Sequence, residues 1–404
     1  MPHPGAARRA QFLPFSRPVI EEDEIAEVVA CLKSGWLTSG PRVLAFEKLF
    51  RERLGVAHAI AVSSATAGLH IVLHALGVGP GDEVIVPSLT WVSTANVVEL
   101  LGAHAVLADV DPGTLQLDPA EVARLLSPRT KAVIPVHFAG AVADLDTIRA
   151  ALAERPDVAV VEDAAHALGS AYKGREIGSD GSPTVFSFHP IKNITTGEGG
   201  MIVLDDDALA ARLKLLRAHG VSKDAWTRYG RDASPRYDVV EPGYKYNMMD
   251  IQAALGLVQT PRLDGFNAAR ARLARRYDTL LADLAGVTPI ARPPYEHQHA
   301  WHLYVVRLDL AALTVGRDAI MAAMGAENIG LGLHFVALHE QAFYRRRSRS
   351  GPLPNATAAS DCILSLPLHP GLSEADQDDV VAALARVLAA HAKPAEARVP
   401  EMSR

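Results

Sequence analysis

One lysine and one aspartate stand where a parallel α/β sheet would bring their side chains to the same edge. Asp163 follows Glu162 at the end of the apolar run 158–161, and Lys192 follows the segment 185–188. Short apolar runs are typical of buried parallel strands, whose carboxyl ends carry ligands. A lysine among apolar neighbours has its ammonium form disfavoured, so its amine can attack an aldehyde and form a Schiff base.

If that aldehyde is pyridoxal phosphate, its ring nitrogen needs an anionic partner, and Asp163 can supply one. His166 would lie one helical turn further on, beside that carboxylate, and would orient it by a hydrogen bond. The hydroxyl of Ser187 would bind the cofactor phosphate. Taken singly, a strand-end aspartate is usually a helix cap and a loop lysine is usually solvated, so the prediction depends on the ordered set.

Small residues at the start of a predicted helix offer a second group for the phosphate. The helix follows a predicted strand over residues 58–62, opens with SSATAG and runs to Leu76. Backbone N–H groups and the helix dipole favour a phosphate there, although a plain Ser/Thr cap is the alternative. Trp91, at the turn after the predicted strand 83–87, can stack on a flat cofactor ring or anchor the core.

The segments EDAAHALGS, FSFHPIKN and GEGG resemble the DegT/DnrJ/EryC1/StrS family of sugar aminotransferases, and the resemblance extends from Phe12 to about Leu366. It implies that Asp163 binds the pyridine nitrogen of pyridoxal phosphate and that Lys192 binds the cofactor covalently. It also implies that Ala65 and Thr66 bind the cofactor phosphate, and it favours stacking for Trp91. The predicted catalytic residues are Lys192, Asp163 and His166.

Within this family, FLPFSRP, SGWLTSGP, IAVSSATAG, PSLTWVST and PGYKYNM are most similar to the enzymes that make UDP-4-amino-4-deoxy-L-arabinose. In the family, the segment ending in GYKYNM reaches the cofactor phosphate of the neighbouring subunit. Lys245 and Asn247 are therefore expected to complete a partner's site in a homodimer, with an exposed turn as the alternative. His334, in GLGLHF, corresponds to segments of the sugar-nucleotide pocket, with a structural histidine as the alternative.

The elements that must position these residues alternate between strand and helix through Leu204, which predicts a largely parallel, helix-covered sheet. The resemblance implies the α/β fold of type I pyridoxal-phosphate-dependent transferases, which is aspartate aminotransferase-like. A large α/β cofactor-binding domain is expected over residues 12–265 and a small C-terminal α+β domain over 266–392. Residues 1–11 and 393–404 are rich in Ala, Pro and charge and are predicted to be disordered tails.

The composition of the chain bears on which kinds of partner it can bind and on the cellular compartment in which it is expected. A chain of 404 residues, 49% hydrophobic and with a net charge of -6, shows no electrostatic sign of nucleic-acid or membrane binding. Cys31 and Cys362 are too few and too far apart in sequence for a metal site or a disulfide framework. The sequence has no signal peptide and no uninterrupted apolar span, so small-molecule partners and a cytoplasmic location are expected.

These observations predict a pyridoxal-phosphate-dependent aminotransferase that moves the amino group of L-glutamate to a keto-sugar nucleotide. The acceptor is expected to be a 4-keto sugar on UDP or another nucleoside diphosphate, and the products an amino sugar and 2-oxoglutarate. Arg228 and Arg231 are candidates for the glutamate carboxylate.

Three alternatives remain. One is a sugar aminotransferase for another nucleotide, ring position or pathway. Another is a sugar dehydratase of the same fold, although such relatives typically carry His in place of the lysine. The third is a non-catalytic, cofactor-binding regulatory protein, against which the intact set of Lys192, Asp163 and Ser187 counts.

Overall fold

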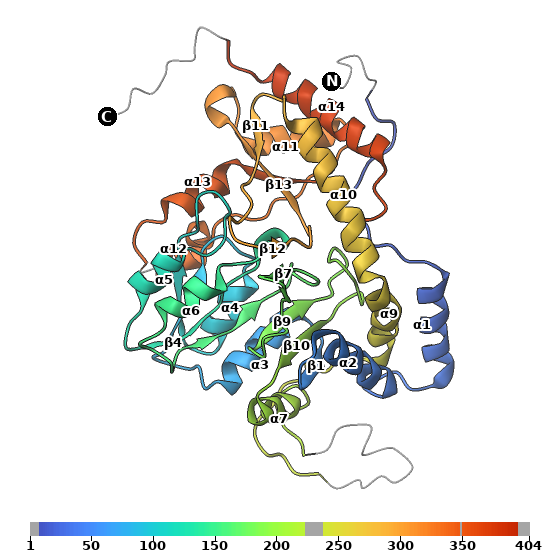
Figure 1. Ribbon diagram of the computed structural model, residues 1–404, viewed down its shortest axis with the longest axis vertical. Coiled ribbons are helices and arrows are strands. Elements are labelled where there is room, and N and C mark those ends of the chain that lie inside the picture. Colours follow the sequence, from blue (N-terminus) through green and yellow to red (C-terminus); the bar gives the residue numbers. More distant parts are fainter. Residues whose placement is uncertain (1–7, 223–236, 348–349, 395–404) are drawn as a thin grey trace.

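A helix-covered sheet forms the centre of the protein in the computed structural model, which describes residues 8–222, 237–347 and 350–394 (Figure 1). One half of the sheet is parallel, in the order β3 (His104–Ala108), β2 (Glu83–Pro87), β4 (Thr130–Val133) and β5 (Ala159–Val160). The other half has the order β6 (Glu162–Asp163), β9 (Thr184–Ser187), β10 (Gly200–Leu204) and β1 (His58–Val62). The halves are joined because the chain passes directly from β5 into β6, which also bridges in parallel from Asp163 to Val136.

Strand direction confirms the prediction of a largely parallel sheet, with β10 as the exception. β6 and β9 are parallel, whereas β10 is antiparallel to both β9 and β1. The reversal arises because the loop after β9, which carries Lys192, returns the chain beside the strand it has just left. This loop therefore stays at the edge of the sheet where β6 also ends.

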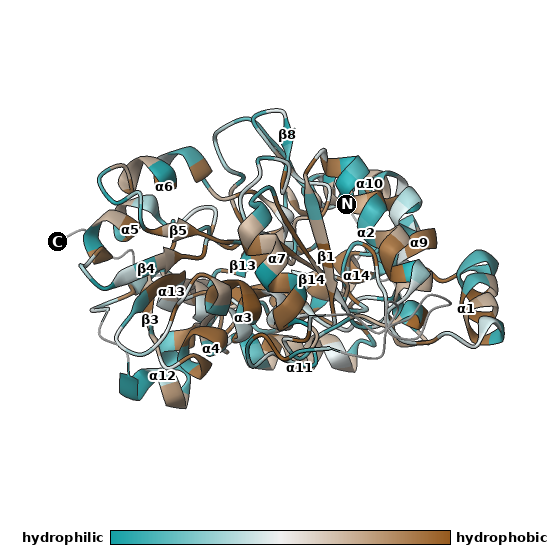
Figure 2. Cartoon of the chain, turned by 90° about the horizontal axis from the view of Figure 1, so that it is seen from below, coloured by the Kyte–Doolittle hydropathy of each residue, from teal (hydrophilic) through white to brown (hydrophobic). Residues whose placement is uncertain are grey.

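Helices cover this sheet on both faces and connect its strands. They are α1 (Glu22–Ser34), α2 (Pro41–Leu54), α3 (Ala65–Ala75), α4 (Ser93–Leu100), α5 (Pro119–Leu125), α6 (Leu145–Ala151), α7 (Asp207–Leu216) and α9 (Asp250–Gln259). Asp118 and Asp144 are the N-caps of α5 and α6, since their carboxylates accept the N–H groups of Ala120 and Thr147. α3 is mostly buried and hydrophobic, whereas α12 (Ala342–Arg347) is apolar at its start and hydrophilic at its three terminal arginines (Figure 2).

A second, smaller sheet lies in the C-terminal part of the chain. It has the antiparallel order β11 (Val287–Pro289), β13 (Tyr304–Leu308) and β14 (Ile363–Leu366). Helices α10 (Leu263–Leu281), α11 (Arg317–Ala326) and α14 (Glu374–Ala390) pack with it around one apolar core, and α13 (Pro354–Cys362) leads into β14. A small sheet of β12 (His297–Gln298), β7 (Ala171–Tyr172) and β8 (Arg175–Glu176) lies between the two parts of the chain.

The two parts of the chain meet over a shared apolar cluster. Ile134 and Phe138, from the strand ends of the large sheet, belong to the same buried cluster as Leu303 and Phe335 from the C-terminal part. The boundary predicted between residues 265 and 266 falls inside the first turn of α10, and the division into two domains stays a prediction. The junction is nevertheless where the predicted site residues gather.

The ends of the described chain contact the C-terminal helices. Arg9 forms ion pairs with Asp376 (2.6 Å) and Asp379 (2.9 Å), and the amine of Lys393 donates to the carbonyl of Ala311 (2.8 Å). The rest of the two predicted tails, residues 1–7 and 395–404, lies outside the described residues, as do Arg228 and Arg231. None of the helices in the described segments has the length and apolar character needed to cross a bilayer.

Candidate active site

Lys192 lies in the loop between β9 and β10. Its N–H donates to the carbonyl of His189 (2.9 Å), and the N–H of Thr196 donates to that of Phe188 (3.0 Å), so the loop closes tightly on the strand end. The side-chain nitrogen Nζ lies 3.4 Å from Nε2 of His302. Burial lowers the pKa of Lys192 to about 8, although the charge of Asp163 acts in the opposite direction. Near neutral pH, much more of this amine is neutral and nucleophilic than in an ordinary lysine.

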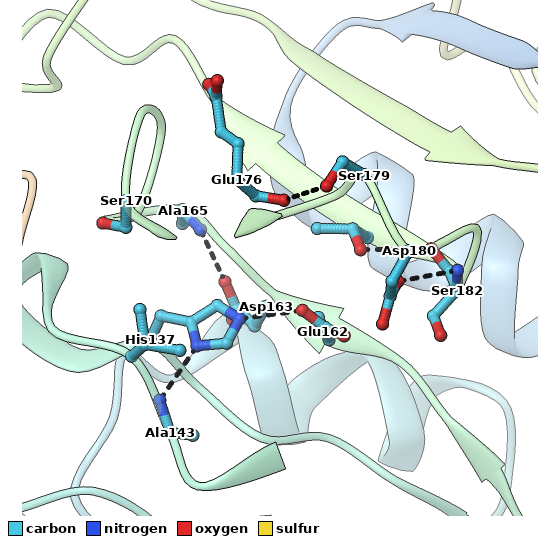
Figure 3. A network of polar contacts seen from close by, with 12 residues as sticks. His137, Ala143, Glu162, Asp163, Ala165, Ser170, Glu176, Ser179, Asp180 and Ser182 are labelled. Atoms are coloured by element: carbon cyan, nitrogen blue, oxygen red, sulfur yellow. Dashed lines mark hydrogen bonds and ion pairs between the residues drawn. The ribbon is translucent and has the colours of Figure 1, made fainter. Parts of the chain in front are cut away.

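Asp163 is buried at the end of β6, and two donors hold its carboxylate. Thr94 Oγ1 donates to Oδ2 (2.8 Å), and the N–H of Ala165 donates to Oδ1 (3.1 Å), the second bond being drawn in Figure 3. Burial raises the pKa of Asp163, although both hydrogen bonds and the charge of Lys192 oppose this shift. Among the residues that the structure describes, no cation forms an ion pair with the carboxylate. A buried acid in that position fits a positively charged ring N–H.

The opposite face of the same strand is held by a buried polar network around Glu162 (Figure 3). The N–H of Ala143 donates to Nδ1 of His137 (3.1 Å), so the ring proton lies on Nε2 and is donated to Glu162 (3.0 Å). Arg149 also binds the Glu162 carboxylate (3.2 Å) and pairs with Asp180. Successive residues of a strand point to opposite faces of the sheet. The network around Glu162 therefore holds β6 on one face, and Asp163 points to the other face, where Lys192 lies.

The start of α3 and the end of β9 meet around a glycine. Ser187 is the cross-strand partner of Gly200, and a Cβ on Gly200 would lie only 2.7 Å from the backbone nitrogen of Ala65. Glycine is thus required for β10 to approach the helix N-terminus. Because the first N–H groups of a helix have no acceptor within it, Ala65 and Thr66 present donors next to Gly200, the strand partner of Ser187. This arrangement fits a phosphate.

Trp91 and His166 flank Phe335 at the junction of the two parts of the chain. The Trp91 side chain is 58% exposed, which is unusual for tryptophan, and its ring centroid lies 5.9 Å from that of Phe335. His166 is buried, stacks on the same phenyl ring (6.0 Å) and packs on His302 (4.3 Å). An exposed aromatic face beside buried rings suits the binding of a flat cofactor.

The expected hydrogen bond from His166 to Asp163 is not formed. Nδ1 of His166 instead accepts the N–H of Ala139 (3.2 Å), which leaves the proton of the neutral ring on Nε2. The reason is local, because the chain beyond β6 forms tight turns rather than the helical turn that the prediction assumed. Burial, assisted by the charge of Lys192, lowers the pKa of His166 far below its ordinary value, so the ring is neutral.

His334 is half-buried near the same site. Its Nδ1 lies 2.9 Å from Ser365 Oγ, and its ring contacts Phe15 (5.2 Å) and Phe335 (5.1 Å). Burial lowers the pKa of His334 to about 3, with a further contribution from the positive charge of Lys192. The FLPFSRP segment, through Phe15, and the C-terminal part thus approach one another beside the lysine.

Lys245 and Asn247 lie elsewhere. They line a cavity of about 450 Å³ together with Ser39, Lys214 and Arg217, and Lys192 is not among its lining residues. The amine of Lys245 donates to Asn247 Oδ1 (2.6 Å), and the Asn247 amide donates to Ser39 Oγ (2.7 Å). Asn247 also bridges Val62 at the end of β1, just before the start of α3, but neither of these two side chains hydrogen-bonds to Lys192 of the same chain.

Two residues that lie at the site, Thr94 and His302, were not predicted from the sequence. Thr94 follows Thr90 by one helical turn after β2, and only the packing of α4 against the end of β6 shows that it reaches Asp163. His302 precedes β13 and is 110 residues from Lys192, so no spacing could connect them. Across the described ranges, no group of three or more His, Cys, Asp or Glu side chains is arranged to hold a metal ion.

The sequence pattern of the DegT/DnrJ/EryC1/StrS aminotransferase family matches residues 18–385. The chain belongs to this family. Membership confirms the prediction of a pyridoxal-phosphate-dependent aminotransferase, and the residues around Lys192 fit that cofactor.

Solved structures of similar proteins agree with this assignment. Spr1654 of Streptococcus pneumoniae, described as a sugar aminotransferase, is 33% identical with a TM-score of 0.86, and the match covers 94% of this chain and 99% of that one. The aminotransferase TlmJ of Streptoalloteichus hindustanus is 36% identical, with the same TM-score and coverage. PseC of Helicobacter pylori, an aminotransferase of pseudoaminic acid biosynthesis, is 28% identical with a TM-score of 0.85, covering 94% of this chain and 100% of PseC. The type I transferase fold is confirmed, whereas the arabinose subgroup stays a prediction.

Proposed function

We propose that the protein transfers the amino group of L-glutamate to a keto sugar carried on a nucleoside diphosphate, giving an amino sugar and 2-oxoglutarate. The observation that carries the proposal is the grouping of the Lys192 amine and the buried Asp163 carboxylate at one sheet edge, with the α3 N-terminus and Ser187 nearby. The similarity to Spr1654 and PseC supports a sugar as acceptor.

Pyridoxal phosphate, when bound, supplies an aldehyde that accepts the amino group and a ring that withdraws electrons. Each part of it has a matching group in this chain. Lys192 Nζ would hold the aldehyde carbon, the Asp163 carboxylate would accept from the ring nitrogen, and Trp91 would pack on the ring. The Ser187 hydroxyl and the N–H groups of Ala65 and Thr66 would bind the phosphate.

Lys192 and Asp163 have separate roles, proton transfer for the lysine and binding of the ring nitrogen for the aspartate. With a pKa of about 8, Nζ of Lys192 is neutral often enough to take the proton from the α-carbon of glutamate and later to return one to the sugar carbon. Asp163, whose carboxylate accepts hydrogen bonds from Thr94 and Ala165, would keep the ring nitrogen protonated. The neutral ring of His166 offers an N–H donor at Nε2 within the site.

Substrate binding and assembly follow from the remaining residues. His334 forms part of the pocket for the sugar nucleotide, for which a 4-keto sugar on UDP is the first candidate. In a homodimer, Lys245 and Asn247 bind the cofactor phosphate of the partner subunit. Lys245 is exposed and Asn247 is half-buried, and this exposure is compatible with that role.

Absorption spectroscopy tests the proposal. L-Glutamate should convert the visible band of the cofactor-loaded protein to a near-ultraviolet band, and one member of a panel of keto-sugar nucleotides should reverse the change. Lys192→Ala should abolish the conversion, whereas Lys173→Ala, which removes an exposed lysine paired with Asp146, should not. A visible band that glutamate leaves unchanged would instead favour another amino donor or the dehydratase chemistry.

A further inference from the structure

His302 is a buried histidine that the chemistry described so far does not use. It is 2% exposed, and its Nε2 lies 3.4 Å from Nζ of Lys192. Its other ring nitrogen, Nδ1, is buried and has no hydrogen-bond partner among the described residues. The ring therefore has one polar contact, and that contact is the amine of the active-site lysine.

The backbone around His302 is fixed from two sides. The carbonyls of Ala139 and Gly140 accept the N–H groups of Leu303 (3.1 Å) and Ala300 (3.0 Å). Gly140 has φ +94°, and a Cβ there would lie 2.9 Å from the backbone nitrogen of His302, so only glycine permits this close approach. The residue therefore has little freedom to move away from Lys192.

Two further groups hold this position from the other side. Arg270 is buried and donates to the carbonyl of His302 (3.3 Å) and to that of Leu368 (2.8 Å). The imidazole of His166 packs against the His302 ring at 4.3 Å. Burial and the neighbouring positive charges lower the pKa of His302 far below its ordinary value, so the ring is neutral.

The position of the ring proton follows from these contacts. A proton on Nδ1 would be a buried donor without an acceptor, which proteins rarely tolerate. A proton on Nε2 points instead at the lone pair of a neutral Lys192 amine. The neutral histidine therefore suits the amine form of the lysine, which is the form that attacks an aldehyde or takes a proton.

We propose that His302 is a positioning residue, whose Nε2–H binds the neutral amine of Lys192 and fixes the direction in which Nζ points. The inference rests on the proposed function, since it concerns the lysine that captures the cofactor and moves the proton. Misplacement of a reacting group by about 1 Å can lower a rate by about 100-fold, so holding Nζ in place contributes to both steps.

A pair of variants separates this role from a merely structural one. His302→Gln places an amide near the position of Nε2, within reach of Lys192, whereas the shorter His302→Asn places it near Nδ1. His369→Asn is the matched control, because His369 is also a buried imidazole (6% exposed) whose ring nitrogens find no hydrogen-bond partner within the described part of the chain, and it forms no hydrogen bond with Lys192.

The first readout is the rate at which cofactor-free protein captures pyridoxal phosphate. Borohydride fixes the captured cofactor, and peptide mass spectrometry counts it on Lys192. We expect capture by His302→Asn to be slower by about tenfold, the size of one lost hydrogen bond, while His302→Gln and His369→Asn stay within about twofold of the unmodified protein.

The second readout is the isotope effect with α-deuterated glutamate. It should increase in His302→Asn at an unchanged KM, because proton transfer by a misdirected amine becomes rate-limiting, and it should return to normal in His302→Gln. Equal behaviour of the Asn and Gln variants, or an equal loss in His369→Asn, would overturn the inference. If the unmodified protein captures no cofactor on Lys192, the proposed function fails as well.

Discussion

Replacing Thr94 by valine tests how the buried carboxylate of Asp163 is kept ionised. The change keeps the shape of the side chain but removes the hydroxyl that donates to Asp163 Oδ2 at 2.8 Å. A hydrogen bond to a charged group contributes about 2 kcal/mol to stability and one to a neutral group about 1 kcal/mol. Thr94→Val should therefore destabilise the protein by about 2 kcal/mol where Asp163 is ionised and by about 1 kcal/mol where it is protonated.

The sign of the pH dependence follows from the pKa of Asp163, which burial raises above its ordinary 3.8. Proton binding by this carboxyl favours the folded state below the unfolded pKa, and the benefit is lost as the pH rises through the folded pKa. Thr94 opposes the shift, so Thr94→Val should raise the pKa of Asp163 further. The variant should lose more stability at pH 8 than at pH 4.

Urea unfolding of the cofactor-free protein, followed by tryptophan fluorescence at several pH values, measures this difference. Thr94→Ser is the control, because it keeps the hydroxyl and loses only a methyl group, at about 1 kcal/mol regardless of pH. A loss of stability in Thr94→Val that does not change with pH would refute the role assigned to the hydroxyl.

Three further predictions concern Gly200 beside the start of α3, the amine of Lys192, and the ion pair between Glu47 and Arg217. Gly200→Ala should weaken pyridoxal phosphate binding by about tenfold or more in a cofactor titration, because the added Cβ would collide with the backbone at the start of α3. Gly265→Ala is the control and should leave binding unchanged, because no atom lies within 4 Å of the added Cβ. In cofactor-free protein, the rate at which an amine reagent labels Lys192 should rise with pH and be half-maximal near pH 8, because only the neutral amine reacts. A midpoint above pH 10, as in an exposed lysine, would contradict the effect of burial. Arg217→Met should lower the free energy of unfolding by about 3–5 kcal/mol, because it leaves the carboxylate of Glu47 buried without its cation. Urea unfolding measures this loss, and a loss below about 1 kcal/mol would show that Glu47 is solvated.

The sequence was sufficient for the elements and residues whose signal is local. The apolar runs that became β1 and β2 have the predicted limits. Ordered motifs around Asp163 and Lys192 pointed to the family that the comparison confirms.

What could not be predicted depends on contacts between distant parts of the chain. The bond from Thr94 to Asp163 depends on how α4 packs against β6, and the contact of His302 with Lys192 depends on how the C-terminal part closes over the sheet. The prediction for His166 was wrong in its hydrogen bond, because it assumed a helical turn where the chain makes tight turns. Sequence periodicity does not encode these placements.

The most direct test of the central claim is to find which residue binds the cofactor. Protein incubated with pyridoxal phosphate, reduced with borohydride and digested should carry one cofactor per chain, on the peptide that contains Lys192. Lys192→Ala should carry none at that peptide. Cofactor fixed mainly on another lysine, or the same amount fixed by Lys192→Ala, would contradict the account.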